Sequence, residues 1–283
     1  MRILLTGCSG QVGYELERSL QALGEVVAVD RGRMDLSDLV QVREVVRAVR
    51  PDLIVNPAAY SAVDKAESEP ELARRINALA PGVMAEEARR LGAAMVQYST
   101  DYVFDGTKQG PYLETDPANP LNVYGRTKLE GEQLVAAAGI DHLILRTSWV
   151  YGLRGKNFLL TMLRLAKERG ELRVVSDQHG APTWSRTIAD TTAVLLAQAR
   201  AEGWWQRHGG TYHLTARGET TWYGFAQAIM EMAGLESPVL PIPGADYPAA
   251  ARRPANSLMN ADKLTAHLCA LPHWKTSLRL CMR

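Results

Sequence analysis

The sequence has few cysteines, almost no excess charge and no long apolar run, and each of these absences argues against a class of protein. Cys8, Cys269 and Cys281 are odd in number and far apart, which fits neither a disulfide framework nor a cysteine metal site. The 32 basic and 31 acidic residues leave a net charge of +1, too little to attract nucleic acid or an anionic membrane. No apolar run approaches the ~20 residues of a membrane-spanning helix. We therefore expect no nucleic-acid partner and no membrane partner.

What the chain does contain is typical of a globular enzyme. It has 283 residues, of which 46% are apolar and 22% are charged, enough for one large domain or one and a half. Its first residues, MRILLTG, pass directly into an apolar run and lack the pattern of a secretory signal peptide. We expect a cytoplasmic protein.

Short apolar runs alternate with segments of helical periodicity over the first 150 residues. Apolar runs that do not alternate with polar residues suit strands that are covered on both faces. Strand–helix alternation predicts an α/β fold, a Rossmann-like, doubly wound parallel sheet with helices on both sides. The expected strands are residues 2–6, 25–29, 52–56, 93–99 and 142–148.

The alternation of apolar runs with helical segments becomes less regular after Trp149. A helix is expected over 157–169 and a strand over 172–176, and from Ser185 onward helices alternate with Pro-rich loops. This last segment looks too irregular to extend the main sheet simply. We predict a dinucleotide-binding domain over 1–150, and over 151–283 a smaller, mainly substrate-binding lobe that is partly interleaved with it.

A glycine-rich loop, TGCSGQVG, follows the first expected strand. Gly7, Gly10 and Gly13 lack a Cβ where the backbone must turn sharply and approach a pyrophosphate. The helix that begins at about Gln11 and Val12 would point its N-terminal amides at that anion. The loop therefore predicts a dinucleotide site.

Charged residues follow the second expected strand, where the adenosine ribose of a dinucleotide would lie. Asp30, twenty residues past Gly10, can accept hydrogen bonds from the ribose, which favours NAD. Arg31 and Arg33 could instead hold a 2′-phosphate, which favours NADP. The residues therefore leave the cofactor open between NADPH and NADH. Further expected cofactor contacts are Asp35, Leu36, Ala58, Ala59 and Tyr60.

The stretch NVYGRTKLEGE places Tyr124 and Lys128 four residues apart, on one face of an expected helix. At about 5 Å and an effective dielectric near 20, the ammonium would stabilise a phenolate by roughly 3 kcal/mol. We therefore expect the pKa of Tyr124 to fall by about two units from its usual ~10. Tyr124 could then donate a proton to a carbonyl oxygen that Thr100 also binds, while Lys128 bonds a nicotinamide ribose.

Several of these stretches together are far more specific than the glycine loop. With STDYVFDG, YGRTKLEGE, RTSWVYG and RRPANSLMN, the sequence resembles the extended short-chain dehydrogenase/reductases over residues 1 to about 260. The likeness is closest to those members that reduce a dTDP-linked 4-keto-6-deoxy-L-sugar to dTDP-L-rhamnose. It implies NADPH as cofactor, with NADH as the alternative, a dTDP-deoxysugar as substrate, and a homodimer.

The resemblance also assigns residues. It places the family's catalytic set on Thr100, Tyr124 and Lys128, and the deoxysugar near Val103, Phe104 and Trp149. It places Arg253, Asn256 and Ser257 beside the nucleotide diphosphate, where an arginine is a fork-shaped donor to phosphate. The substrate-binding residues are assigned by likeness alone.

A bound metal is not expected. Some relatives bind a divalent metal between subunits, and Glu15 matches one of their acidic residues, but PTWSRTIAD lacks the glutamate expected there. The six histidines show no ligand spacing.

Two other functions remain alternatives. Some members of the same family are non-catalytic regulatory subunits of methionine adenosyltransferase, in which the reactive set is not needed. Others are nucleotide-sugar epimerases or dehydratases, which require acid–base groups beyond the tyrosine, and no such pair is obvious near Thr100.

Overall fold

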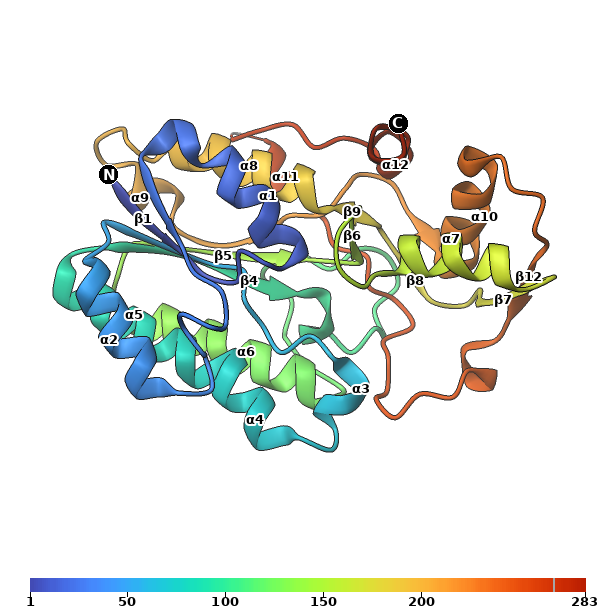
Figure 1. Ribbon diagram of the computed structural model, residues 1–283, viewed down its shortest axis with the longest axis horizontal. Coiled ribbons are helices and arrows are strands. Elements are labelled where there is room, and N and C mark those ends of the chain that lie inside the picture. The colour runs from blue at the N-terminus through green and yellow to red at the C-terminus, as the bar shows by residue number, and fades with distance from the viewer. Residues whose placement is uncertain (267) are drawn as a thin grey trace.

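A six-stranded parallel sheet forms the centre of the molecule in the computed structural model, which describes residues 1–266 and 268–283 (Figure 1). Its strand order is β10-β5-β4-β3-β1-β2. The strands are β1 (Arg2–Leu5), β2 (Glu25–Ala28), β3 (Leu53–Asn56), β4 (Ala94–Thr100), β5 (His142–Thr147) and β10 (Gly210–His213). The first five lie within one residue of their expected bounds, and the Rossmann-like α/β fold is confirmed.

Both faces of the sheet are covered by helices, which explains why the strands read as continuous apolar runs. Ile3 and Leu5 pack beneath α1 (Gln11–Ser19) and α8 (Ser185–Gln198). Leu4 and Ile54 point the other way, toward the core under α2, α5 and α6. Figure 1 shows these two helical layers above and below the sheet. The lower helices are α2 (Leu39–Val49), α5 (Ala80–Leu91) and α6 (Val123–Ala137).

The sixth strand, β10, comes from the part of the chain that we expected not to extend the sheet. That expectation is wrong at these residues, because β10 pairs in parallel with β5 from Gly210 to His213. Tyr212 and Leu214, which lies just after the strand, are buried in the same core as Leu143 of β5. The second half of the chain thus supplies one strand and one covering helix, α8, to the central sheet, while the predicted boundary at residue 150 stays a prediction.

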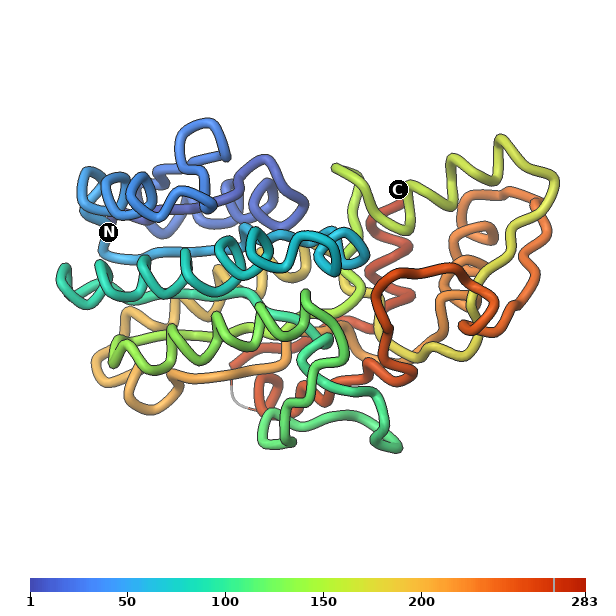
Figure 2. The backbone as a smooth tube through the Cα atoms, turned by 90° about the horizontal axis from the view of Figure 1, so that it is seen from below, coloured from blue at the N-terminus to red at the C-terminus, as the bar shows by residue number. Residues whose placement is uncertain are grey.

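A second region lies at one end of the sheet, built mostly from the chain after residue 150 (Figure 2). Its core contains Leu159, Phe225, Ile229 and Trp274, all buried. The expected helix forms as α7 (Phe158–Glu168), and the expected strand forms as β7 (Leu172–Val175), which pairs with β12 (Val239–Ile242). The larger helices beside them are α10 (Trp222–Ala233) and α12 (Trp274–Cys281).

Short elements connect these parts. The short helices are α3 (Val63–Ala66), α4 (Pro70–Arg74), α9 (Trp204–His208) and α11 (Asp262–Thr265), with single turns η1 (Gln21–Leu23), η2 (Arg75–Leu79), η3 (Asp101–Val103) and η4 (Gly244–Asp246). The two-residue strands are β6 (Val150–Tyr151), β8 (His179–Gly180), β9 (Thr183–Trp184) and β11 (Thr220–Thr221). Among the described residues, no helix combines the length and the apolar character needed to cross a membrane.

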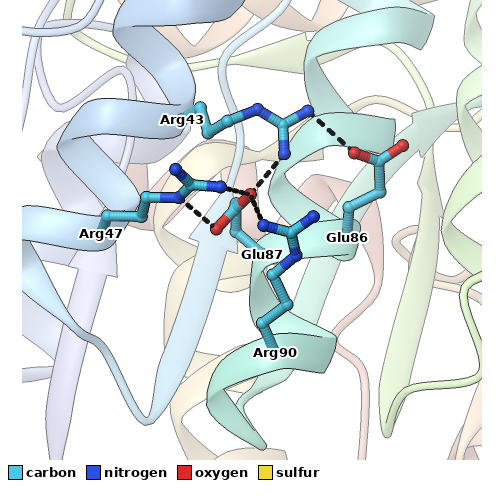
Figure 3. A network of polar contacts seen from close by, with 5 residues as sticks. All are labelled: Arg43, Arg47, Glu86, Glu87 and Arg90. Carbon is cyan, nitrogen blue, oxygen red and sulfur yellow. Dashed lines mark hydrogen bonds and ion pairs between the residues drawn. The ribbon is translucent and has the colours of Figure 1, made fainter.

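A buried carboxylate joins two of the lower helices. Glu87 of α5 has a side chain only 2% exposed, and it accepts hydrogen bonds from Arg43 and Arg47 of α2 (Figure 3). The Arg47 bonds measure 2.8 and 3.0 Å, and Arg90 lies 3.6 Å away. The hydrogen bonds from Arg47 hold the pKa of Glu87 below its usual value, although burial opposes them. Glu86, beside it, makes one bond to Arg43 and is exposed.

We predict that Glu87→Gln destabilises the protein, because it removes the charge that three arginines share. Loss of buried charge-assisted hydrogen bonds costs about 1–3 kcal/mol, or roughly 2–8 °C in melting temperature. Glu86→Gln, the matched control, should shift the melting temperature by no more than about 1 °C. Thermal unfolding of both variants measures the difference.

The destabilisation should also depend on pH. Since the pKa of Glu87 is lowered on folding, its contribution is complete above the unfolded pKa of about 4.3 and is lost as pH falls through the folded pKa. The melting temperatures of the parent and of Glu87→Gln should therefore converge as the pH falls below about 4. A gap that widened in acid would contradict this account.

Candidate active site

A cleft of about 660 Å³ opens at the carboxyl ends of the sheet strands. In an open parallel sheet this edge is where ligands bind. The structure brings to its wall the residues predicted to contact a cofactor except Arg33, the three predicted catalytic residues, and one predicted substrate residue. They are Gly7, Gly10, Gln11, Val12, Gly13, Asp30, Arg31, Asp35, Leu36, Ala58, Ala59, Tyr60, Thr100, Tyr124, Lys128 and Trp149.

The three glycines of the loop differ in what they do. Gly7 has a φ of 56°, and a Cβ there would lie 2.9 Å from the Ala58 Cβ. A Cβ on Gly13 would lie 2.1 Å from the Gly7 carbonyl oxygen, so both positions are required by the packing of the chain itself. Gly10 has a φ of −78° and only that same oxygen nearby, at 3.2 Å. Its lack of a side chain therefore leaves space in the cleft at the start of α1, and a phosphate fits this cradle.

The acidic and basic residues that follow β2 also lie at the cleft, and they bond to one another. Asp30 Oδ1 accepts from the backbone N–H groups of Gly32 and Arg33, at 3.0 and 3.3 Å. Arg31 Nε donates to Asp35 Oδ2 at 3.2 Å, and the Arg31 side chain is largely exposed. Asp30, which can accept from a ribose hydroxyl, and Arg31, a cation for a 2′-phosphate, thus both line the cleft, as the sequence indicated.

The reactive wall is built where α6 begins against the end of β4. Asn122 caps the helix, its Oδ1 accepting from the Gly125 N–H at 2.8 Å. A Cβ on Gly125 would lie 2.2 Å from the Tyr102 carbonyl oxygen, so glycine permits this close approach. The first turn of α6 therefore holds Tyr124 beside Thr100, which accepts from the Tyr102 N–H at 3.1 Å.

Lys128 is buried one helical turn behind Tyr124, with 3% of its surface exposed. Its Nζ donates to the carbonyl oxygen of Tyr98 at 2.6 Å. Burial lowers the pKa of Lys128 to about 8, against an opposite effect of the Glu132 carboxylate. The ammonium is therefore close to losing its proton under mildly alkaline conditions.

The prediction that Lys128 makes the Tyr124 phenol more acidic is wrong for this structure. Burial raises the pKa of Tyr124 to about 12, although a hydrogen bond with Thr100 opposes the shift, and the neighbouring Asp101 carboxylate adds to it. Burial destabilises the phenolate more than the hydrogen bond with Thr100 stabilises it. Tyr124 is consequently a neutral phenol across the physiological pH range.

Among the cleft residues that the sequence analysis did not assign to the site, four stand out for their chemistry. Asp101 follows Thr100 and accepts its hydroxyl hydrogen bond at 2.9 Å, and burial raises the pKa of Asp101 to about 6. Tyr102 meets the Tyr124 ring edge-on, with centroids 5.6 Å apart. Position at the end of β4 could have identified both. The other two are Lys156 and Trp222.

Trp222 lies flat against the predicted substrate residue Trp149, with ring centroids 3.6 Å apart. Trp149 has a φ of 46°, and a Cβ on Gly180 would lie 2.4 Å from its indole ring. The Trp149 ring is therefore held between two segments of the second region. Nothing in the local sequence links residues 149 and 222, which meet only through the fold.

Val103 and Phe104, expected near a sugar, do not line the cleft. Both side chains are fully buried in a cluster with Tyr112 and Met259. The Phe104 ring stacks on Tyr112 with centroids 4.2 Å apart. The turn η3 directs these side chains into the core, so they support the turn that carries Asp101 and Tyr102 and do not face the cleft.

The three C-terminal residues expected beside a diphosphate also lie outside the cleft lining. Arg253 donates to both carboxylate oxygens of Asp64, at 3.0 and 2.7 Å. The Asn256 side chain donates to the carbonyls of Lys108 and Gly110, each at 2.8 Å. Ser257 is buried. Here the polar groups of Arg253 and Asn256 bind the protein itself, and the diphosphate role stays a prediction.

Within residues 1–266 and 268–283, no three His, Cys, Asp or Glu residues gather as a possible metal site. One of the six histidines, His267, lies outside the described residues.

Comparison with known proteins identifies the family. A family model described as the RmlD substrate binding domain matches residues 1–283. The chain belongs to this family. The dTDP-4-dehydrorhamnose reductase of Burkholderia thailandensis is 50% identical, over 100% of this chain and 98% of the relative. These findings confirm the resemblance to the extended short-chain dehydrogenase/reductases and the expectation of an oxidoreductase.

Two solved structures of dTDP-4-dehydrorhamnose reductases match closely. The dTDP-4-dehydrorhamnose reductase of Clostridium acetobutylicum has a TM-score of 0.93 at 37% identity, over 100% of this chain and 98% of that chain. The Bacillus anthracis enzyme, solved in complex with NADP, has a TM-score of 0.91 at 36% identity, over 99% of this chain and 98% of that chain.

The two glycines with different surroundings predict different variants. Gly10→Ala should fold with a melting temperature within about 2 °C of the parent, yet bind NADPH about tenfold or more weakly, because a methyl group would occupy the phosphate cradle. Gly13→Ala should lose more than about 5 °C, since its Cβ meets backbone. Calorimetry and fluorescence titration with NADPH measure both. Equal effects of the two variants on stability would contradict this division.

Proposed function

We propose that this protein reduces the C4 ketone of dTDP-4-dehydro-L-rhamnose to dTDP-L-rhamnose with NADPH, and that Tyr124 donates the proton. One observation carries the proposal: Tyr124, Thr100 and Lys128 line the same cleft as a glycine loop with room for a phosphate. The relatives' names support the substrate, and the Bacillus anthracis complex supports the cofactor.

The proposed acid is the neutral Tyr124 phenol. Its pKa of about 12 keeps the proton on the oxygen until the ketone oxygen gains negative charge. A phenol that is not ionised beforehand can donate in every turnover. The raised pKa therefore suits the reductive direction, in which the group must start protonated.

Thr100 is proposed to position the same oxygen. In the structure, the Thr100 hydroxyl donates to Asp101 Oδ1 at 2.9 Å. We propose that this hydroxyl turns to the ketone oxygen when substrate enters, adding a second donor where negative charge develops.

The cofactor would lie along the lining from Arg31 past the glycine loop to Lys128. When bound, the reduced nicotinamide supplies the hydride. Lys128 is proposed to donate to the ribose next to that ring while retaining the Tyr98 carbonyl, since an ammonium has three N–H donors. The lysine therefore orients the ligand and places positive charge near the phenol.

Tyr124→Phe tests the acid. The variant should fold and bind NADPH within about twofold of the parent, but its kcat should fall by about 10²–10⁴, the usual contribution of a positioned acid. Loss of the nicotinamide absorbance on addition of dTDP-4-dehydro-L-rhamnose measures turnover. Tyr223→Phe, which removes a hydroxyl that accepts from Gln227 and lies outside the cleft lining, is the matched control and should retain full activity. Full activity in Tyr124→Phe would refute the assignment.

The pH profile tests the lysine. Only the protonated amine carries positive charge, so kcat/KM should fall as pH rises through the Lys128 pKa of about 8. Because a guanidinium keeps its proton, Lys128→Arg should lower activity overall but remove this alkaline limb. An unchanged limb in Lys128→Arg would assign it to another group.

A further inference from the structure

A loop from the second half of the chain is fastened to the glycine loop. We name residues 152–157, which follow β6, the strap. Arg154 Nε donates to the Ser9 carbonyl oxygen at 3.3 Å, and Asn157 Nδ2 donates to Gln11 Oε1 at 2.8 Å. Asn157 also donates to the Gly152 carbonyl at 2.8 Å, closing the strap on itself. The hydrogen bonds from Arg154 and Asn157 thus both end on the phosphate cradle.

Packing reinforces these hydrogen bonds. The Arg154 guanidinium lies over the Tyr14 ring at 4.2 Å, and Arg18 lies over the same ring at 3.4 Å. Gly155 has a φ of 73°, which lets the strap turn close to α1. A Cβ added to Gly155 would lie 3.5 Å from Gln11 Cγ. These contacts therefore fix the position of the strap against α1.

The strap carries two cations, Arg154 and Lys156, whereas the glycine loop has none, and of these two only Lys156 lines the cleft. The loop TGCSGQVG contains no lysine or arginine, although a pyrophosphate brings two negative charges. Three cations line the cleft: Arg31, Lys128 and Lys156. Arg31 pairs with Asp35 at the ribose end, and Lys128 bonds Tyr98 at the reactive wall. Lys156 is exposed, and among the described residues its ammonium has no acidic partner.

We propose that Lys156 is a pyrophosphate-binding residue, delivered to the glycine loop by the strap. The backbone amides at the start of α1 would bind one side of the anion, and the ammonium would bind the side that faces the strap. The second half of the chain then contributes directly to dinucleotide affinity. This inference rests on the proposed use of NADPH.

Titration of the full-length protein with NADPH, followed by ligand fluorescence, tests the proposal. Lys156→Gln should weaken binding about tenfold, the loss expected for one charge-assisted contact to phosphate. Lys156→Arg should bind within about threefold of the parent, since it keeps the charge. Lys167→Gln, on the exposed side of α7 and outside the cleft, makes the same charge change and should bind normally.

A ligand without the pyrophosphate separates this contact from a general effect. The affinity for adenosine 2′-monophosphate, measured by competition with NADPH, should not change in Lys156→Gln. NADPH binding by Lys156→Gln equal to that of the parent would overturn the proposal, and so would equal weakening for both ligands. If the parent protein itself failed to bind NADPH, the proposed function would fall and this inference with it. Normal parent binding with an unaffected variant would overturn the inference alone.

Discussion

One strand residue, Tyr98, connects the reactive wall to both layers of the molecule. Its carbonyl oxygen accepts the buried Lys128 ammonium of α6 at 2.6 Å, and its phenol pairs with Thr192 of α8 at 2.7 Å. A buried cation is tolerated only with such a partner, because its loss of solvation must be offset. The place of Lys128, and of Tyr124 one turn earlier, therefore depends on a carbonyl at the end of β4 and on the helices packed around it.

The fold was largely predictable because its physical demands repeat along the chain. Strands buried on both faces must be apolar throughout, so five strands appeared within one residue of their expected bounds. β10 was missed because Tyr212 is its one apolar residue, and Tyr212 with Leu214 just after the strand gives too weak a pattern among loops. Its pairing with β5 is decided by tertiary packing, to which local sequence gives no signal.

The candidate site was predictable in position but not in its electrostatics. Spacing alone placed Tyr124 and Lys128 on one helical face, and the glycine pattern placed the cradle. Spacing contains nothing about solvation, which reverses the expected pKa shift of Tyr124. Likewise, η3 turns Val103 and Phe104 into the core, a direction that residue type could not reveal. The stacking of Trp149 on Trp222 joins segments 73 positions apart, beyond any local pattern.

The placement of β10 beside β5 has a consequence for how the molecule unfolds. Without the chain beyond residue 150, β5 would become an open sheet edge, and Ile3 and Leu5 would lose the cover of α8. The first 150 residues are thus not an autonomous folding unit, and heat should melt the whole chain in a single cooperative transition. A fragment ending near Trp149 would expose apolar surface and self-associate.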